Sequence, residues 1–499
     1  MRKEERRRFL TLVLALLTLL VFGTVTVAAE EETGTSPTTT ETTTAAEETT
    51  TAPAEVTATS ITKGIGKGSD GNWYYFTDGK VDTSKNTIAE GLVDGTTGWW
   101  LIRDGVVART TTTVAENEHG WWFCKNGQVD FSFTGFASNE YGVWRIEKGK
   151  VNFKYSDIIE TTINGTKGWW YIYNGKVRTN ETTVAQNKFG WWYVKNGMVD
   201  FTYTGVARNQ YGWWRIENGK VNFNYNGLAM NEHGWWLLKG GKVNFDYTGL
   251  YPNDAGWWLL QKGKVNFSYT GNYDYYGTTY SLSGGKVTGA PGKRIIYLTF
   301  DDGPYQYTDQ LLGILAKYHV PATFFVTSAY PSYAYDITLE RQQGHMVAVH
   351  TYTHNYATIY SSDSAYWNDF NRMNNVIKQR TGTTTSLFRF PGGSSNTVSR
   401  SYSSGIMSRL STQATQKGYQ YFDWNVMSGD AGGVTSTSGC YNNMVNGCKY
   451  MNVSVVLCHD VKGYSVNAIE PFIQWAQSNG YAFMPLCRTS PTAHQSISN

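Results

Sequence analysis

The chain has 499 residues, which is enough for roughly two to four domains. Outside residues 1–29, which hold five basic and two acidic side chains, Lys and Arg balance Asp and Glu, and this neutrality argues against a nucleic-acid partner. Aromatic residues make up 15% of the chain and charged residues only 17%, a composition that excludes a wholly disordered chain and suits uncharged ligands such as sugars.

The first 29 residues have the pattern of an export signal. Residues 2–8 are basic, residues 9–22 are apolar apart from two Thr, and Ala28 and Ala29 offer small side chains for cleavage before Glu30. An uncleaved anchor is the alternative, because residues 9–29 are long enough to span a bilayer. Both interpretations place the remainder outside the cytoplasm, and only the second gives it contact with a membrane.

A segment rich in Thr and Glu follows at residues 30–62. It contains no Lys, Arg or aromatic residue, so it cannot bury enough apolar surface to offset its chain entropy. We expect a disordered linker that holds the rest of the protein away from the membrane.

Residues 63–288 consist of repeats with a period near 22 residues. Ten units, aligned on the second residue of a Trp-Trp pair, run from Trp73 to Tyr280. Each unit has Gly at the second position of a two-residue turn, as in Asn218-Gly219, and a type I′ hairpin turn needs positive φ at both positions. The pattern predicts a solenoid-like array of β-hairpins.

The turn fixes a register that predicts two faces for each hairpin. Ile216 should pair with Val221 and Trp214 with Phe223, which places the second Trp of each pair on an apolar core face. The first Trp then lies on the polar face, where it either packs against the next hairpin or forms a platform for sugar rings or quaternary ammonium groups. Seven units have a first Trp: Trp99, Trp121, Trp169, Trp191, Trp213, Trp235 and Trp257.

These repeats resemble the aromatic hairpin repeats of choline-binding and glucan-binding modules in wall-associated proteins of Gram-positive bacteria. The resemblance covers about 225 residues and implies that the seven first Trp residues bind a cell-wall ligand.

After residue 292 the pattern changes to apolar runs that alternate with helix-like segments. We predict strands at 295–300, 322–326, 346–349, 387–390, 419–424, 453–457 and 481–485, and helices at 309–318, 368–380, 406–416 and 468–478. This alternation predicts an α/β domain with a parallel sheet, open or closed. Cys440 and Cys448 fall in one predicted loop outside the cell, where a local disulfide is an option, as is pairing of Cys458 with Cys487.

Polar residues cluster where the predicted strands end, which is where parallel α/β folds place their chemistry. Asp301 and Asp302 follow the first strand, and His350 and His354 follow the third. The remaining segments are Arg389–Gly393 after the fourth strand, Trp424–Asp430 after the fifth and Leu457–Asp460 after the sixth. Each segment is ambiguous alone, but their joint placement indicates one site.

The five segments, in this order, resemble the motifs of the polysaccharide deacetylase domain (NodB-like, carbohydrate esterase family 4). The resemblance implies a distorted (β/α) barrel and metal-dependent removal of acetyl groups from sugars. It implies that Asp302, His350 and His354 bind one divalent metal, with zinc as the default and cobalt, nickel or iron also suited to this ligand set.

The same resemblance implies roles for the other residues. Asp301 would be the general base, oriented by Arg389, while His459 would be the general acid, partnered by Asp430. Leu457 would wall the pocket for the acetyl methyl group, a backbone N–H near Gly392 would face the oxyanion, and Trp424 would contact substrate. Many family members have Tyr where Gly392 stands, an acidic residue at Met427 and Trp at Ala431, so the rim of the substrate groove differs here.

The sequence thus predicts an export segment (1–29), a linker (30–62), wall-binding repeats (63–288), a deacetylase domain (289–488) and a tail (489–499). The leading hypothesis is a secreted, wall-bound N-deacetylase acting on amino sugars of a cell-wall polysaccharide, above all peptidoglycan. Two alternatives stay open. One is an O-acetyl esterase acting on xylan or another glycan, and the other is a non-catalytic wall-binding adhesin.

Overall fold

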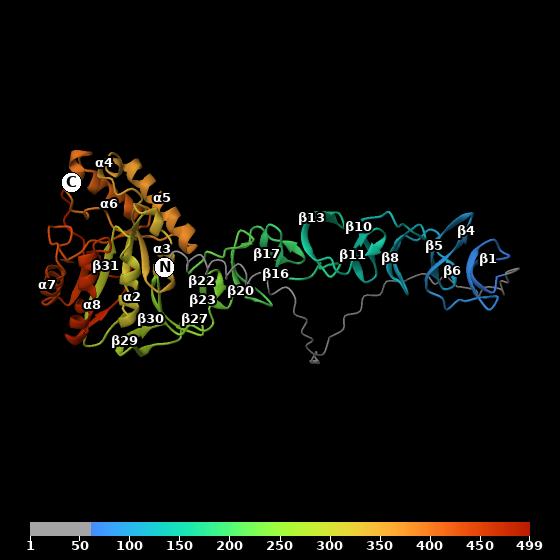
Figure 1. The fold of residues 1–499 in the computed structure, drawn as a ribbon, viewed down its shortest axis with the longest axis horizontal. Helices are drawn as coiled ribbons and strands as arrows, with labels where there is room; N and C mark the ends of the chain where they lie inside the picture. Colours follow the sequence, from blue (N-terminus) through green and yellow to red (C-terminus); the bar gives the residue numbers. More distant parts are fainter. Residues whose placement is uncertain (1–60) are drawn as a thin grey trace. The chain divides into compact units, whose positions relative to one another are not determined.

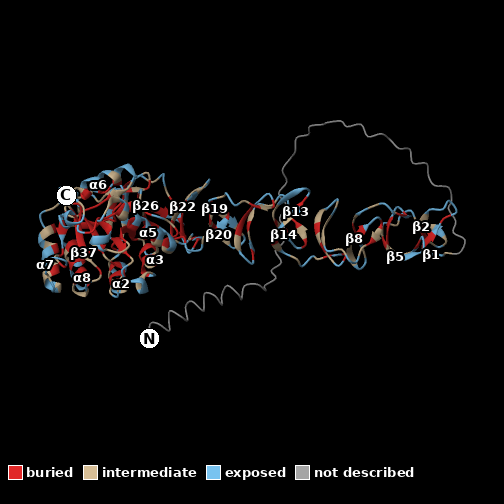
Figure 2. Ribbon diagram, turned by 90° about the horizontal axis from the view of Figure 1, so that it is seen from above, coloured by how far each residue is buried: buried red, intermediate tan, exposed pale blue. Residues whose placement is uncertain are grey.

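The computed structural model describes residues 61–499, which form an antiparallel sheet of hairpins followed by a C-terminal α/β domain (Figure 1). The predicted export segment and nearly all of the predicted linker lie outside the described residues. Within residues 61–499, no helix is long and apolar enough to cross a membrane. Buried residues line the strands of the repeats and are most abundant in the C-terminal domain (Figure 2).

Each of the ten repeats is a three-stranded unit. The first strands are β1 (Lys63–Lys67), β4 (Thr87–Val93), β7 (Thr113–Asn117), β10 (Gly135–Asn139), β13 (Asp157–Ile163), β16 (Thr183–Asn187), β19 (Gly205–Asn209), β22 (Gly227–Asn231), β25 (Gly249–Asn253) and β28 (Gly271–Tyr275). The central strands, seven of which carry a Trp pair, are β2 (Trp73–Thr77), β5 (Thr96–Arg103), β8 (Gly120–Lys125), β11 (Gly142–Glu147), β14 (Thr166–Tyr173), β17 (Gly190–Lys195), β20 (Gly212–Glu217), β23 (Gly234–Lys239), β26 (Gly256–Gln261) and β29 (Thr278–Ser283). The short third strands are β3 (Lys80–Val81), β6 (Val106–Val107), β9 (Gln128–Val129), β12 (Lys150–Val151), β15 (Lys176–Val177), β18 (Met198–Val199), β21 (Lys220–Val221), β24 (Lys242–Val243), β27 (Lys264–Val265) and β30 (Lys286–Gly289).

The predicted hairpin turn is confirmed. Asn218 and Gly219 have φ of 49° and 77°, as a type I′ turn requires, and Ile216 pairs with Val221. A single further pairing joins each unit to the next, as between Trp214 of β20 and Lys242 of β24. The units therefore form one continuous antiparallel array.

The predicted pairing of Trp214 with Phe223 is wrong. Strand β21 ends at Val221, because the side chain of Asn222 accepts a hydrogen bond from the backbone N–H of Asn224 at 2.9 Å and turns the chain. Phe223 is consequently 46% exposed. Trp214 instead pairs with Ala207 of β19, a strand type that the sequence analysis missed.

The second Trp of the pair lies in the core of the repeats, as expected. Trp214 is 9% exposed, and its indole N–H donates to the side-chain oxygen of Asn209 at 2.9 Å. The first Trp of one unit packs against the second Trp of the next, with 5.0 Å between the ring centroids of Trp191 and Trp214. The first Trp therefore contributes to the packing between successive units.

This difference in burial predicts different stability losses. Trp214→Ala should destabilise its unit by roughly 3–5 kcal/mol, because it removes a large core side chain. Trp213→Ala should cost less, because that ring is only half-buried. Hydrogen exchange of the amides in β20 to β24 measures both losses locally, and equal protection losses would contradict the assignment.

The C-terminal domain has a curled parallel sheet flanked by helices (Figure 1). Its strand order is β35-β34-β33-β32-β31-β37-β36, with β38 also beside β31. The strands are β31 (Arg294–Asp301), β32 (Thr323–Thr327), β33 (Met346–Thr351), β34 (Leu387–Phe388), β35 (Gln420–Tyr421), β36 (Val426–Met427), β37 (Val453–His459) and β38 (Tyr481–Phe483). The α/β class and the parallel sheet are confirmed, and the sheet forms a half-barrel.

Four helices match the prediction, and three were missed. The helices are α2 (Thr308–Tyr318), α3 (Asp336–Gln342), α4 (Tyr356–Ile359), α5 (Asp363–Thr381), α6 (Ile406–Gln416), α7 (Thr437–Cys448) and α8 (Gly463–Ser478), with short 3-10 turns η1 (Pro331–Tyr333) and η2 (Val398–Ser401). The missed helices are α3, α4 and α7.

Helix α7 overturns the suggested local disulfide. Cys440 and Cys448 lie on this one helix, eight residues apart, which separates their Cα atoms by about 12 Å at the α-helical rise. A disulfide needs Cα atoms within about 7 Å. All five described cysteines are free and buried, Cys458 and Cys487 included.

The last repeats share a hydrophobic core with the C-terminal sheet. Alternate residues of β31 face two cores, so that Leu298 points to the helices and Tyr297 to a second core that includes Trp257 and Tyr280 of the repeats. Asp254 accepts hydrogen bonds from the backbone N–H and the hydroxyl of Ser386, both at 2.6 Å. Trp257, one of the seven first Trp residues, is 2% exposed in this shared core, so its ring is not accessible to a cell-wall ligand.

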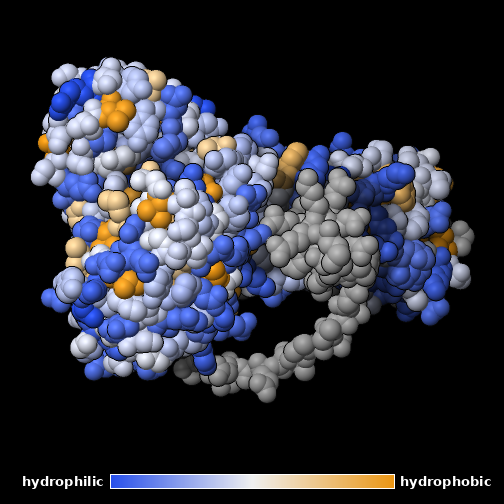
Figure 3. Space-filling model, turned by 60° about the vertical axis from the view of Figure 1, so that its left-hand side comes forward, coloured by the Kyte–Doolittle hydropathy of each residue, from blue (hydrophilic) through white to orange (hydrophobic). Residues whose placement is uncertain are grey.

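Exposed apolar side chains do not form one large patch on the face shown in Figure 3. Hydrophobic residues appear there as separate spots among hydrophilic ones.

Candidate active site

The carboxyl ends of β31, β33, β34 and β37 bring the predicted site residues together. Asp301 ends β31 beside His459 of β37, with which it pairs across the sheet. Asp302 follows with φ of 74°, and His354 has φ of 51°. Left-handed backbone is uncommon for residues other than Gly, and Asp and His adopt it more often than most. The hydroxyl of Thr327 holds this turn by donating to the Asp302 carbonyl at 2.8 Å.

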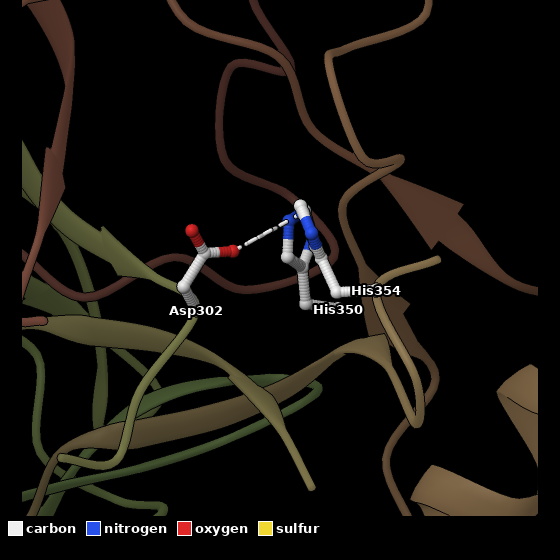
Figure 4. Close-up of side chains that lie close together, drawn as sticks. All are labelled: Asp302, His350 and His354. Carbon is white, nitrogen blue, oxygen red and sulfur yellow. Dashed lines mark ion pairs between the residues drawn. The ribbon is translucent and has the colours of Figure 1, made fainter. Parts of the chain in front are cut away.

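Asp302, His350 and His354 form a cluster whose ligand atoms all lie within 4.8 Å of one another (Figure 4). Oδ1 of Asp302 is 3.5 Å from Nε2 of His350 and 3.2 Å from Nε2 of His354. His350 is buried, while His354 and Asp302 are partly exposed, so the cluster is open on one side.

The hydrogen bonds of this cluster fit a bound cation. Nδ1 of His350 lies 2.8 Å from the carbonyl oxygen of Arg389, which can only accept, so Nδ1 carries the proton and Nε2 presents a lone pair. Burial lowers the pKa of His350 to about 3 and keeps the ring neutral. Oδ1 of Asp302 is buried without a hydrogen-bond donor among the described residues. Lone pairs that face one another in this way suit a divalent metal with oxygen and nitrogen ligands.

Asp301 lies beside the cluster in a buried, oriented position. The carboxylate is 3% exposed, and Arg389, which is completely buried, donates to it from Nη1 at 2.7 Å. Arg389 is fixed in turn by donating to Thr299 and to the carbonyls of Phe422 and Asp423. Burial raises the pKa of Asp301, against the opposing charges of Arg389 and His459.

His459 and Asp430 form a second pair on the other side of Asp302. Nδ1 of His459 donates to Asp430 at 2.8 Å, and Asp430 also accepts from the backbone N–H of His459 at 2.9 Å. Nε2 then points towards Asp302, 3.9 Å from Oδ2. Burial disfavours the charged ring, but the hydrogen bond and charge of Asp430 outweigh it and raise the pKa of His459 to about 9.

The predicted substrate-side residues lie around these groups. Leu457 is 7% exposed near the end of β37, and Gly392 is exposed in the loop after β34. Trp424 stacks 5.6 Å from the guanidinium of Arg389, and its buried indole N–H has no acceptor among the described residues.

Two family models match parts of the chain. Residues 288–406 match the family model for polysaccharide deacetylases, and nine segments between residues 61 and 266 match the choline-binding repeat.

The chain carries choline-binding repeats followed by a C-terminal polysaccharide deacetylase domain.

A peptidoglycan-N-acetylglucosamine deacetylase of Bacillus cereus is 29% identical to the chain over 198 residues, which are 38% of this chain and 68% of the relative. A bifunctional xylanase/deacetylase of Pseudobutyrivibrio xylanivorans is 29% identical over 201 residues, 40% of this chain and 30% of the relative. The solved catalytic domain of a peptidoglycan N-acetylglucosamine deacetylase from Eubacterium rectale is 51% identical, and the match covers 42% of this chain and 96% of that one with a TM-score of 0.41.

Three residues near the site have contacts that the motifs did not predict. Thr299 accepts from Arg389 and donates to the carbonyl of Val456 at 2.7 Å, and Tyr356 lies two residues after His354. Asp460 is buried behind the site, where Thr308 donates to it at 2.5 Å. Tyr356 lies just beyond the segment that ends at His354, so a wider window around that segment would have included it.

We expect the folded domain to lose stability in acid because of His345. This residue is buried and is not part of the cluster. Burial lowers the pKa of His345 to about 3. Between pH 6.5 and pH 3, His345 is therefore protonated in the unfolded chain but neutral in the folded chain. The stability contribution is present above pH 6.5 and is lost as the pH falls towards 3. We expect His345→Gln to reduce the acid slope of the unfolding free energy by up to about 1.4 kcal/mol per pH unit. Urea denaturation between pH 7 and 4 measures this slope, and an unchanged slope would contradict the assignment.

Proposed function

We propose that the protein is a secreted, metal-dependent N-deacetylase that acts on amino sugars of a cell-wall polysaccharide, with peptidoglycan as the first candidate. The observation that carries this proposal is the arrangement of Asp301 and His459 around the cluster of Asp302, His350 and His354. One side chain is placed to accept a proton and another to donate one, next to a site for a divalent cation.

A divalent metal held by Asp302, His350 and His354 would supply Lewis acidity for the acetyl carbonyl and lower the pKa of water. Asp301, oriented by Arg389, accepts the proton of the attacking water. Leu457 limits the space for the acetyl methyl group, and a backbone N–H near Gly392 faces the developing oxyanion.

The pair of His459 and Asp430 supports an amide as the substrate bond. An amine is a poor leaving group unless its nitrogen is protonated as the bond breaks. His459 donates that proton from Nε2, while Asp430 holds Nδ1 and stabilises the charged ring. An activated ester has much less need of this assistance.

We further propose that the repeats hold the enzyme on the cell wall. Grooves between successive units are lined by aromatic rings, and one of about 460 Å³ includes Trp191 and Tyr211. Such grooves suit sugar rings or quaternary ammonium groups. The proposed wall-binding set is Trp99, Trp121, Trp169, Trp191, Trp213 and Trp235. Residues 1–29 would direct export, and residues 30–62 would act as a spacer.

Acetate release from a panel of glycans tests the proposal. We expect release from peptidoglycan and chitin oligomers, with free amine formed in equal amount, and loss of release with a chelator. Release from acetylated xylan alone would favour the O-acetyl esterase. Wall binding without acetate release from any glycan would favour the adhesin.

A further inference from the structure

Tyr356, a residue outside the predicted motifs, lies against His354 of the cluster. Helix α4 begins at Tyr356, two residues after His354, and the ring centroids of these two residues are 5.7 Å apart. The Tyr356 ring is half-buried, yet its hydroxyl makes no hydrogen bond to any residue in 61–499. The hydroxyl is therefore free to pair with a bound molecule.

Gly392 shows where this hydroxyl lies. A Cβ atom at Gly392 would come within 2.6 Å of the Tyr356 oxygen, so the hydroxyl fills the space that a side chain at residue 392 would take. Gly392 is exposed and has φ of 76°, which places the contact at the rim of the site. Tyr356 thus places an aromatic hydroxyl at the rim, in the space that the missing side chain of Gly392 leaves open.

The surrounding contacts hold the tyrosine in place. Tyr356 packs edge-on against Tyr360, one helical turn later, with 5.5 Å between ring centroids. Tyr360 is fully buried and donates to the carbonyl of Pro391 at 2.7 Å. Asn396 closes the same loop by donating to the carbonyl of Gly393 at 2.9 Å. Helix α4 and the loop at 391–393 therefore form one support, and a supported group binds at lower entropic cost than a mobile one.

We propose that Tyr356 is a substrate-positioning residue, whose hydroxyl hydrogen-bonds to a sugar hydroxyl of the glycan at the rim of the site. The proposal rests on the proposed function, because it assigns the glycan bound at that site. A sugar hydroxyl both donates and accepts, so it pairs with a phenol in either direction. A rim position favours contact with the sugar over contact with the acetyl group, which must lie deeper, at the cluster.

The test compares Tyr356→Phe with the wild type and with Tyr352→Phe. Tyr352 lies in the same loop, but its ring stacks on Arg372 at 3.9 Å, so it serves as a matched control. Loss of one hydrogen bond in Tyr356→Phe should raise KM for a chitin pentamer. It should lower kcat/KM for the pentamer, relative to kcat/KM for an aryl acetate, by roughly 3- to 10-fold. The melting temperature and the metal content should match those of the control. An unchanged ratio of the two kcat/KM values, whether or not both values fall, would overturn the proposal.

Calorimetric binding of a glucosamine pentamer keeps this test independent of turnover. We expect Tyr356→Phe to bind the pentamer roughly 3- to 10-fold more weakly than the wild type and the Tyr352→Phe control. Equal affinities, or no binding by the wild type, would overturn the proposal. Binding that weakens in the variant, without acetate release from any glycan by the wild type, would instead refute the proposed N-deacetylase and leave Tyr356 as a glycan-binding residue.

Discussion

His350→Ala is expected to abolish acetate release and to remove tight binding of a divalent metal. The substitution deletes one of the three ligand atoms and leaves the buried Oδ1 of Asp302 facing a single imidazole. Loss of an outer partner of a metal ligand already costs roughly 10–100-fold in affinity or activity, so loss of a ligand should cost more. Metal titration by calorimetry and acetate release measure the two losses separately.

His345→Gln is the matched control for this substitution. It also replaces a buried histidine of the same segment, but one that is not part of the cluster. The control should keep its metal and its turnover at neutral pH. Full activity of His350→Ala, or equal loss in both variants, would contradict the assignment of His350.

Asp301→Asn should keep the metal and lose most of the turnover. The three residues of the cluster remain, but the carboxylate proposed as the general base is gone, and general acid–base assistance is typically worth roughly 10²–10⁴-fold. The variant should also be less stable, because Arg389 is completely buried and loses its counter-charge. Single-turnover acetate release, metal content and urea denaturation separate these effects.

Thr299→Val is the comparison for the loss of stability expected of Asp301→Asn. It removes a different acceptor of Arg389 and leaves Asp301 in place. We expect lower stability with turnover well above that of Asp301→Asn. If both variants lose turnover in proportion to stability, Asp301 is a structural partner of Arg389 and not the base.

Local turn chemistry made much of the repeat region predictable. The pair Asn218-Gly219 imposes a type I′ turn, and the turn fixes which residues pair across the hairpin. The prediction went wrong one residue beyond Val221, because the side chain of Asn222 bends the chain there. Strand β19 was missed because it is paired on one side only by β20 and carries few of the residues that mark a strand.

Contacts between distant segments were less predictable than motifs. Short motifs at strand ends predicted that Asp301, Asp302, His350, His354 and His459 lie together, and the sheet does bring these residues together. The burial of Trp257 depends instead on the C-terminal sheet that packs against its unit, and nothing in the repeat period indicates it. The one local sign is Asp254, which stands where neighbouring units have Glu232 or Gln210 and which binds Ser386 of the deacetylase domain.

The position of Tyr356 illustrates the same limit. The sequence shows that residue 392 is Gly, but only the structure shows which side chain occupies the space beside it. Two segments separated by 36 residues meet there because Tyr360 binds the carbonyl of Pro391.

Mass spectrometry of a chitin pentamer after incubation with the protein tests the central claim most directly. The protein is first stripped of metal with a chelator and then returned to zinc, cobalt or buffer alone. We predict that the pentamer loses acetyl groups and gains free amines only after metal is restored, and that His350→Ala shows no such change. Equal deacetylation by the stripped and the restored wild type, or none by either, would contradict the assignment of a metal-dependent N-deacetylase.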